Sequence, residues 1–350
     1  MWVGFPHTIL CVSVYPFHHS LRNDYAQCFD IERTVSPDWH QYLQSLEGSG
    51  FVNCLTNPKG KKNMMKPCDP QTLNTLTEYE NYSVTSHSYD TTRQPIGMEV
   101  ILGCFAATNT RPLHEQIILD AGCGTGNYLQ AIHDKVGICH GIEINEGMLA
   151  QAQSKFGNGS HVQLDHGSLL NLPYPDDFFD GIMCNQVIHH LDDPGKIDAF
   201  PNVKAMLFAC YRVLRPHGVL VLNMCSCPQL IDGFWWADLI PQVVDKMAAR
   251  IPSLDLTGKM LEAVGFQKGG IIVPLHEILQ GPSYFDPKGP LQKSFRDGDS
   301  TWSLLSEAEL HQTLERIHAM NEDGSIIEYL DEREKRRKRV GQTTFIFARK

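Results

Sequence analysis

Short apolar runs recur through the middle and the end of the chain, and each is bounded by polar residues or glycine. Runs of this kind are typical of strands buried in a sheet. The candidate strands are QIILD (116–120), GICHGIEIN (137–145), HVQLDHGS (161–168), FDGIMCNQVI (179–188), GVLVLNMCS (218–226), GGIIVPL (269–275) and TTFIFARK (343–350).

The segments between these runs carry apolar residues at helical spacing, and Pro95 suits the first turn of a helix through Gly97 to Ala106. The other candidate helices are 125–136, 146–157, 202–218, 234–251 and 257–266. Because strands and helices alternate, we predict an α/β fold of the Rossmann-like, doubly wound type. Its seven-stranded sheet is mostly parallel, with helices on both faces.

The pattern also divides the chain. Residues 1–75 show little periodicity and predict a loosely ordered N-terminal extension or cap, whereas 76–274 form the core. Residues 275–342 are too long for a plain connection and predict a lid on the substrate side. Residues 343–350 return to the core as its closing strand.

A glycine-rich turn joins the first strand to the helix that follows it. The stretch DAGCGTG, from Asp120 to Gly126, has glycine at every second position, and bare backbone of this kind lets a ligand approach the main chain. A dinucleotide fingerprint needs a glycine where this chain has Asn127, and no Gly-Lys-Ser/Thr follows that would make a phosphate loop. Glu143, at the end of the next strand, suits the hydroxyls of a ribose. The spacing therefore indicates a nucleoside ligand without a pyrophosphate.

Four blocks between Ile117 and Asn223 extend this signal: LDAGCGTGNY, GIEINEGMLAQAQ, LPYPDDFFDGIMCNQVIHHLDD and RVLRPHGVLVL. In order and spacing they resemble the class I S-adenosylmethionine-dependent methyltransferases, specifically the small-molecule type 11 domain family. The resemblance implies S-adenosylmethionine as the cofactor and a small molecule as the methyl acceptor. The alternatives are a protein or nucleic-acid methyltransferase, a non-catalytic S-adenosylmethionine-binding protein, and an NAD-dependent oxidoreductase, which Asn127 disfavours.

The resemblance also implies contacts to the cofactor. Glu143 would hold the ribose, Ile144 would pack on the adenine, and Asn185 would lie beside the methyl group. Ser168 stands where the family has an acidic residue for the adenine amino group, so either Ser168 or nearby Asp165 would serve it. The implied cofactor-binding residues are Arg93, Asp120, Ala121, Gly122, Cys123, Gly124, Gly126, Glu143, Ile144, Ser168, Leu169 and Asn185.

An acceptor that must lose a proton would need a base, and a histidine is well matched to that task near neutral pH. The catalytic candidates are His189, His190 and Tyr89, with His87 and His276 as further histidines. For the adjacent pair, a structural role under the following helix is the competing interpretation. Trp235 and Trp236 either roof the substrate pocket or belong to the core. In the lid, we expect Tyr284, Phe285 and Trp302 to line the pocket.

The charge and the cysteine content of the chain limit the kinds of ligand and partner that we expect. The chain has 30 Lys and Arg against 40 Asp and Glu, a formal net charge of −10, which disfavours nucleic acid. The eleven cysteines lack the paired spacing of a zinc site, so we expect free thiols and no metal. The apolar N-terminus is shorter than a membrane span, and we predict a cytoplasmic protein with no membrane partner. The basic stretch 334–339 has acidic neighbours and predicts a solvated helix.

Overall fold

The computed structural model describes Tyr15–Pro16, Ser86, Tyr89, Asp90 and residues 92–108, 111–157, 160–192 and 200–350. The chain divides into two compact units, Met1–Pro16 with Cys68–Lys350, and Phe17–Pro67. All described residues belong to the first unit. The predicted extension over residues 1–75 lies outside the described residues, apart from Tyr15–Pro16.

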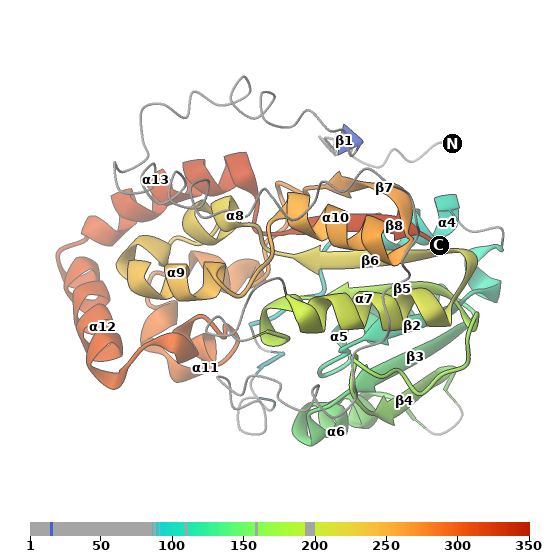
Figure 1. Ribbon diagram of the computed structural model, residues 1–350. Helices are drawn as coiled ribbons and strands as arrows, with labels where there is room; N and C mark the ends of the chain where they lie inside the picture. Colours follow the sequence, from blue (N-terminus) through green and yellow to red (C-terminus); the bar gives the residue numbers. More distant parts are fainter. Residues whose placement is uncertain are drawn as a thin grey trace, which may run out of the picture. The chain divides into compact units, whose positions relative to one another are not determined.

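One sheet organises the described part of the chain (Figure 1). Its order is β7-β8-β6-β5-β2-β3-β4, with the two-residue strand β1 (Tyr15–Pro16) antiparallel to β7. Strands β2 to β6 run parallel to one another, whereas β8 runs antiparallel to both β6 and β7. This confirms the predicted Rossmann-like, mostly parallel sheet. The strand bounds are β2 Ile117–Ala121, β3 Ile138–Glu143, β4 Val162–His166, β5 Phe179–Asn185, β6 Leu214–Met224, β7 Gln267–Ile272 and β8 Thr344–Arg349.

Helices connect the strands and cover the sheet. Residues of α4 and α5 share one buried cluster with the central strands, and α7 packs against α10 in front of the sheet in Figure 1. These helices and α6 follow the predicted alternation with the strands. Their bounds are α4 Met98–Thr108, α5 Asn127–Ile132, α6 Glu146–Lys155, α7 Pro201–Val213 and α10 Leu254–Val264.

A second helical layer consists of helices that come after β6 and helices that lie within the long connection between β7 and β8. Helix α8 packs on α9 and α13, and α12 packs on α13. Since α8 begins at Cys227, directly after the end of β6, this layer stands at the carboxyl edge of the parallel strands. The helices are α8 Cys227–Asp232, α9 Pro241–Ala248, α11 Lys293–Arg296, α12 Glu307–Glu322 and α13 Ser325–Val340. Short 3-10 turns are η3 Leu113–Glu115, η4 Ile188–His190, η6 Ala237–Leu239, η7 Gly281–Phe285, η8 Gly289–Leu291 and η9 Trp302–Leu304.

Two predicted helices differ from the structure. The helix expected over 202–218 ends at Val213, and β6 already begins at Leu214. The helix expected over 234–251 is interrupted, because Pro241 has no N–H to donate and instead occupies the first turn of α9.

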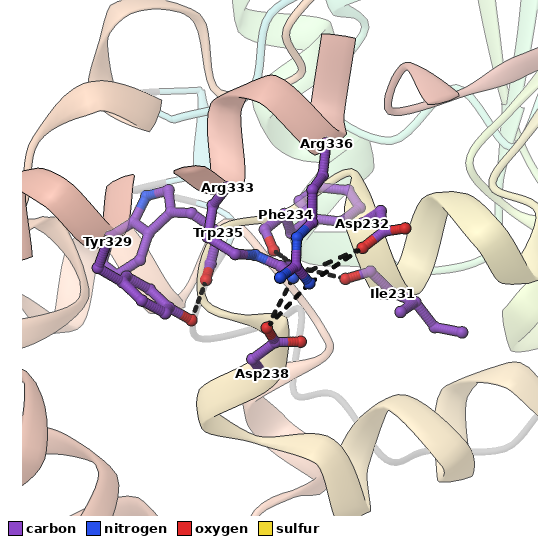
Figure 2. A network of polar contacts seen from close by, with 8 residues as sticks. All are labelled: Ile231, Asp232, Phe234, Trp235, Asp238, Tyr329, Arg333 and Arg336. Atoms are coloured by element: carbon purple, nitrogen blue, oxygen red, sulfur yellow. Dashed lines mark hydrogen bonds and ion pairs between the residues drawn. The ribbon is translucent and has the colours of Figure 1, made fainter. Parts of the chain in front are cut away.

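Helix α13 is anchored by buried arginines, so the stretch 334–339 is only partly a solvated helix. Arg337 is 2% exposed and bonds to Glu334 and to the carbonyl oxygen of Leu275. One turn earlier, Arg333 is 1% exposed and pairs with Asp238 at 2.7 Å (Figure 2). Together with a bond from Arg333 to the carbonyl oxygen of Ile231 in α8, these contacts fix α13 to α8, to η6 and to the segment after β7.

Candidate active site

The glycine-rich turn lies between β2 and α5, as the sequence predicts, and its backbone is tied to the neighbouring strand. The N–H groups of Gly122 and Cys123 both donate to the carbonyl oxygen of Ile142, at 2.9 and 3.0 Å. The φ angles of Gly122, Gly124 and Gly126 are +80°, +52° and +78°. Residues with a Cβ rarely adopt such angles, so glycine is needed at each position.

The three glycines serve different purposes. A Cβ on Gly122 would lie 2.7 Å from a methyl carbon of Val187, and one on Gly126 would lie 3.2 Å from Ala152. A Cβ on Gly124 would meet nothing within 4 Å. At Gly122 and Gly126, neighbouring side chains leave no room for a Cβ atom, whereas Gly124 faces open space.

Gly124 also lines a cavity of about 490 Å³, a volume that includes the opening to solvent. The cavity brings together seven of the predicted residues: Tyr89, Arg93, Asp120, Gly122, Cys123, Gly124 and Asn185. Six further lining residues were not predicted: Gln94, Thr125, Asn127, Tyr128, Gln186 and Leu279. The remaining predicted residues do not line it: Ala121, Gly126, Glu143, Ile144, Ser168, Leu169, His189 and His190.

Asp120 is the most unusual group in this cavity. Its side chain is 1% exposed, and neither carboxylate oxygen has a hydrogen-bond partner among the described residues. Burial raises the pKa of Asp120 to about 8; the nearby Asn185 amide opposes the shift and the Glu143 carboxylate adds to it. The Nδ2 atom of Asn185 is close enough to interact with this carboxylate, but neither group has a hydrogen bond of regular geometry among the described residues. Unpaired buried polar groups are costly, so this arrangement points to a polar or cationic ligand.

Glu143 supports the loop from behind the cavity. Its Oε2 accepts from the N–H of Gly124 at 2.9 Å, and its Oε1 accepts from the N–H of Asn145 at 2.8 Å. Burial raises the pKa of Glu143, and these backbone bonds oppose the shift. Each carboxylate oxygen has two lone pairs, so capacity remains for ligand hydroxyls. The next residue, Ile144, is 44% exposed and available to a flat ligand.

The two candidates for the adenine contact already have partners. Asp165 accepts from the Tyr174 hydroxyl at 2.8 Å, and Ser168 Oγ accepts from the N–H of Leu170 at 3.2 Å. Leu169, which follows Ser168, is buried. An adenine contact from either side chain stays a prediction.

The segment before β2 packs directly onto the glycine-rich turn. Asp90 accepts from Thr125 Oγ1 at 2.5 Å and from Asn127 Nδ2 at 2.9 Å, and it pairs with Lys155 at 2.5 Å. Asparagine at position 127 therefore has a structural role, because a glycine there could not donate a hydrogen bond to Asp90. Tyr89, next to Asp90, lines the cavity, and burial raises the pKa of its hydroxyl.

Arg93 connects this segment to the long insertion between β7 and β8. Its Nε donates to the carbonyl oxygen of Gly298, and its Nη2 lies 3.6 Å from a carboxylate oxygen of Asp299. The insertion also supplies Leu279 to the cavity wall. The cavity is thus bounded by residues before β2, by the glycine-rich turn and by the insertion.

The two adjacent histidines lie in the 3-10 turn η4, with ring centroids 4.1 Å apart. His189 Nε2 lies 3.4 Å from the hydroxyl oxygen of Ser300 in the insertion. Burial lowers the pKa of His189 well below its usual range, and burial together with the charge of Arg250 lowers the pKa of His190 to about 3. Neutral imidazoles with such low pKa values are weak bases. His276 is exposed and does not line the cavity, and His87 lies outside the described residues.

The aromatic residues form a core instead of a pocket roof. Trp235 is 0% and Trp236 is 1% exposed, and Trp236 packs against Tyr284 and Trp302. The expectation that Tyr284, Phe285 and Trp302 line the cavity is wrong, because the first and last pack on Trp236 and Phe285 is 51% exposed.

The described residues show neither a metal site nor a membrane span. Within those residues, no group of His, Cys, Asp and Glu side chains is arranged to hold a metal ion. In the same part of the chain, no helix combines the length and the apolar character of a membrane span.

The fold and the cavity are those of an α/β protein with a candidate ligand site at the carboxyl edge of its sheet. Comparison with known proteins narrows this class. Residues 119–222 match the type 11 family model described as a methyltransferase domain. The chain therefore carries a class I S-adenosylmethionine-dependent methyltransferase domain, and S-adenosylmethionine is the cofactor of that family.

Individual relatives agree with this family. An uncharacterized methyltransferase of Mycobacterium tuberculosis (strain ATCC 25618 / H37Rv) is 25% identical over 124 residues, which are 35% of this chain and 58% of the relative. A demethylmenaquinone methyltransferase of Bacillus licheniformis is 29% identical over 119 residues, 33% of this chain and 47% of the relative. The chain thus matches about half the length of these relatives. A solved protein of Anabaena variabilis ATCC 29413, named as a methyltransferase of an antibiotic biosynthesis pathway, shares the fold with a TM-score of 0.57. It is 22% identical, and the match covers 71% of this chain and 96% of that one.

Proposed function

We propose that this protein is an S-adenosylmethionine-dependent methyltransferase that transfers a methyl group to a small molecule by in-line displacement. The observation that carries the proposal is the cavity beside Gly124, where the carboxylate of Asp120 is buried without a partner. A ligand with a positive charge would supply that partner, and the cofactor carries both a sulfonium and an ammonium group. Glu143, which already anchors the turn through the N–H of Gly124, keeps free lone pairs on its carboxylate that would take the ribose hydroxyls.

Bound S-adenosylmethionine supplies a methyl group that is already activated for transfer. The task of the protein is then to hold both reactants in line and to keep water out, which can lower the barrier by several kcal/mol. Gly124 lets the cofactor reach the main chain, and Asn185 lies on the cavity wall close to Asp120. Leu279 and Arg93 cover the cavity from the side of the insertion.

A small acceptor is supported by three observations. The net charge of −10 disfavours nucleic acid, the insertion supplies Leu279 to the cavity wall, and one relative is named as a demethylmenaquinone methyltransferase. The chemistry of the acceptor follows from the available bases. His189 and His190 have lowered pKa values and Tyr89 has a raised one, so none is a strong base at neutral pH. This favours an acceptor that is nucleophilic as it binds.

The cysteines described are free thiols, which supports a reducing, cytoplasmic location.

Transfer of label tests the proposal. Purified protein is incubated with methyl-labelled S-adenosylmethionine and, in parallel, with a small-molecule extract, a protein extract and RNA. We expect label in the small-molecule fraction and none with the Gly124→Val variant, whose side chain would fill the cavity. Label in protein or RNA would favour the alternative acceptor classes. Tight cofactor binding with no transfer to any fraction would indicate a non-catalytic binding protein.

A further inference from the structure

Asn223 is a buried polar residue near the end of the otherwise apolar strand β6, with 0% exposure. Its side chain bonds in two directions. On one side, Oδ1 accepts from Gln186 Nε2 at 2.9 Å and from the hydroxyl of Thr343. On the other side, Nδ2 donates to the hydroxyl oxygen of Tyr128 at 3.1 Å and to Oδ1 of Asn185 at 3.3 Å. Tyr128 and Asn185 both line the cavity.

These bonds decide what Tyr128 presents to a ligand. Its hydroxyl oxygen accepts from Asn223 and also from the main-chain N–H of Ile96 at 3.3 Å. With both lone pairs engaged, the hydroxyl proton must point elsewhere, and no other described residue accepts it. Burial raises the pKa of Tyr128, so the hydroxyl keeps this proton. Tyr128 therefore has a hydrogen-bond donor left over on the cavity wall.

The same reasoning applies to Asn185. Its Oδ1 is engaged by Asn223, which leaves its Nδ2 beside the carboxylate of Asp120, without a hydrogen bond of regular geometry among the described residues. The orientation of this amide is set by Asn223, whose own orientation is set by the donors Gln186 and Thr343 behind it. One residue outside the cavity thus fixes the polarity of two residues inside it.

We propose that Asn223 is a positioning residue, which turns Tyr128 and Asn185 so that both present hydrogen-bond donors to an acceptor atom of the bound ligand. This inference rests on the proposed function, because the ligand is the cofactor or its demethylated product. Two neighbouring donors suit an oxygen atom of the ligand, whereas Asp120 beside them suits a cationic group.

The near-isosteric substitution Asn223→Asp reverses the arrangement. The introduced carboxylate still accepts from Gln186 and Thr343, but its second oxygen is an acceptor where the wild type has a donor. The Tyr128 hydroxyl would then donate to that oxygen, and the Asn185 amide would turn to do the same. Both donors are withdrawn from the cavity without any change in its lining residues.

A double-mutant cycle tests the inference, with S-adenosylhomocysteine as the probe and calorimetry as the readout. We expect Asn223→Asp to weaken binding about tenfold and Tyr128→Phe by roughly threefold to tenfold, the range for one or two hydrogen bonds. The double variant should bind within about twofold of Asn223→Asp alone, because the Tyr128 donor is already withdrawn. A purely structural role for Asn223 would instead give effects that multiply.

Asn321→Asp is the matched control. Its Nδ2 also donates to two oxygens, those of Pro287 and Ile317, but it lies in α12 and does not line the cavity. It should keep wild-type affinity. If Asn223→Asp does not fold, Asn223→Ala serves in the same cycle, because Tyr128 and Asn185 are then free to turn. Wild-type affinity in Asn223→Asp, or multiplying effects, would overturn this inference alone. A wild-type protein that does not bind the probe would overturn the proposed function as well.

Discussion

The carboxylate of Glu143 accepts a hydrogen bond from the main-chain N–H of Gly124, with 2.9 Å between Oε2 and the nitrogen. This bond joins the end of β3 to the one glycine of the turn that faces open space. The residue predicted to hold the ribose is therefore also the residue that shapes the loop.

Replacing Glu143 should weaken cofactor binding for both reasons. Hydrogen bonds to a charged group contribute about 1.5–3 kcal/mol, so we expect Glu143→Ala to lower the affinity for S-adenosylmethionine by about tenfold to a hundredfold. Glu143→Gln keeps one acceptor oxygen and should lose less. Calorimetric titration measures both, and an unchanged affinity of Glu143→Ala would move the ribose elsewhere.

Gly124→Ala should abolish tight binding while the protein still folds, because Gly124 lines the cavity and the added methyl group would meet no protein atom within 4 Å. Gly324→Ala is the matched control. Gly324 has φ +79° and also has nothing within 4 Å of its ideal Cβ, but it lies at the start of α13. Both variants should lose about 1 kcal/mol of stability from the strained backbone. Only Gly124→Ala should lose affinity, and equal affinities would contradict the assignment of the cavity.

Asp120 should make stability fall with rising pH. Its folded pKa of about 8 lies above its ordinary value of 3.8, so the folded protein binds more protons than the unfolded chain between these values. The free energy of unfolding of the ligand-free protein therefore decreases from about pH 4 to about pH 8 on account of this group. Asp120→Asn should remove that contribution and be more stable than the wild type at pH 8. Urea unfolding at pH 5 and pH 8 measures the difference, and a variant less stable at pH 8 would contradict it.

The same group should link cofactor binding to proton release. A cationic ligand favours the ionised carboxylate, so affinity should rise with pH up to about 8, and binding near neutral pH should release a proton. Calorimetry in buffers of different ionisation enthalpy counts that proton. Asp120→Asn should bind more weakly and release none. Proton uptake by the wild type would refute the assignment.

The buried guanidinium of Arg333 should be important for stability. It bonds to the carbonyl oxygens of Ile231 and Phe234 and to Asp238 (Figure 2). Arg333→Met leaves those carbonyl groups without their donor and should cost roughly 3 kcal/mol. Arg336→Met should cost less than about 1 kcal/mol, because Arg336, on the same helix and also near Asp238 and Asp232, is 44% exposed. Urea unfolding compares the two, and equal losses would show that burial of Arg333 is unimportant.

The histidine pair should tolerate substitution. Because burial lowers the pKa of both His189 and His190, we expect His189→Gln and His190→Gln to keep turnover within about tenfold of the wild type at pH 7.5. General base catalysis contributes about 10²- to 10⁴-fold, so a loss in that range with intact cofactor affinity would identify a base. Turnover with the acceptor found in the label-transfer experiment is the measurement.

The sequence predicted the sheet and the glycine-rich turn because both depend on local pattern. An apolar run followed by glycines at positions 122, 124 and 126 permits few other structures. Helix α8 escaped prediction because it is only six residues long, although its capping box of Ser226 and Gln229 was a readable signal. The early end of α7 was also readable, since Pro216 cannot continue a helix.

Other features depend on contacts between distant segments. Arg93 meets Gly298 and Asp299 across more than two hundred residues, and no local pattern announces that pairing. Leu279 and Gln186 reach the cavity for the same reason. Asn223 left one trace, an amide inside an apolar strand, but its role depends on Tyr128 and Asn185, which come from other elements.

The central claim is that the cavity beside Gly124 binds S-adenosylmethionine, and a direct titration tests it most simply. Purified protein is titrated in a calorimeter with S-adenosylmethionine and, separately, with NAD. We predict saturable binding of one equivalent of S-adenosylmethionine, no binding of NAD, and loss of the first signal in Gly124→Ala. Binding of NAD in place of S-adenosylmethionine, or S-adenosylmethionine affinity that Gly124→Ala leaves intact, would contradict the account.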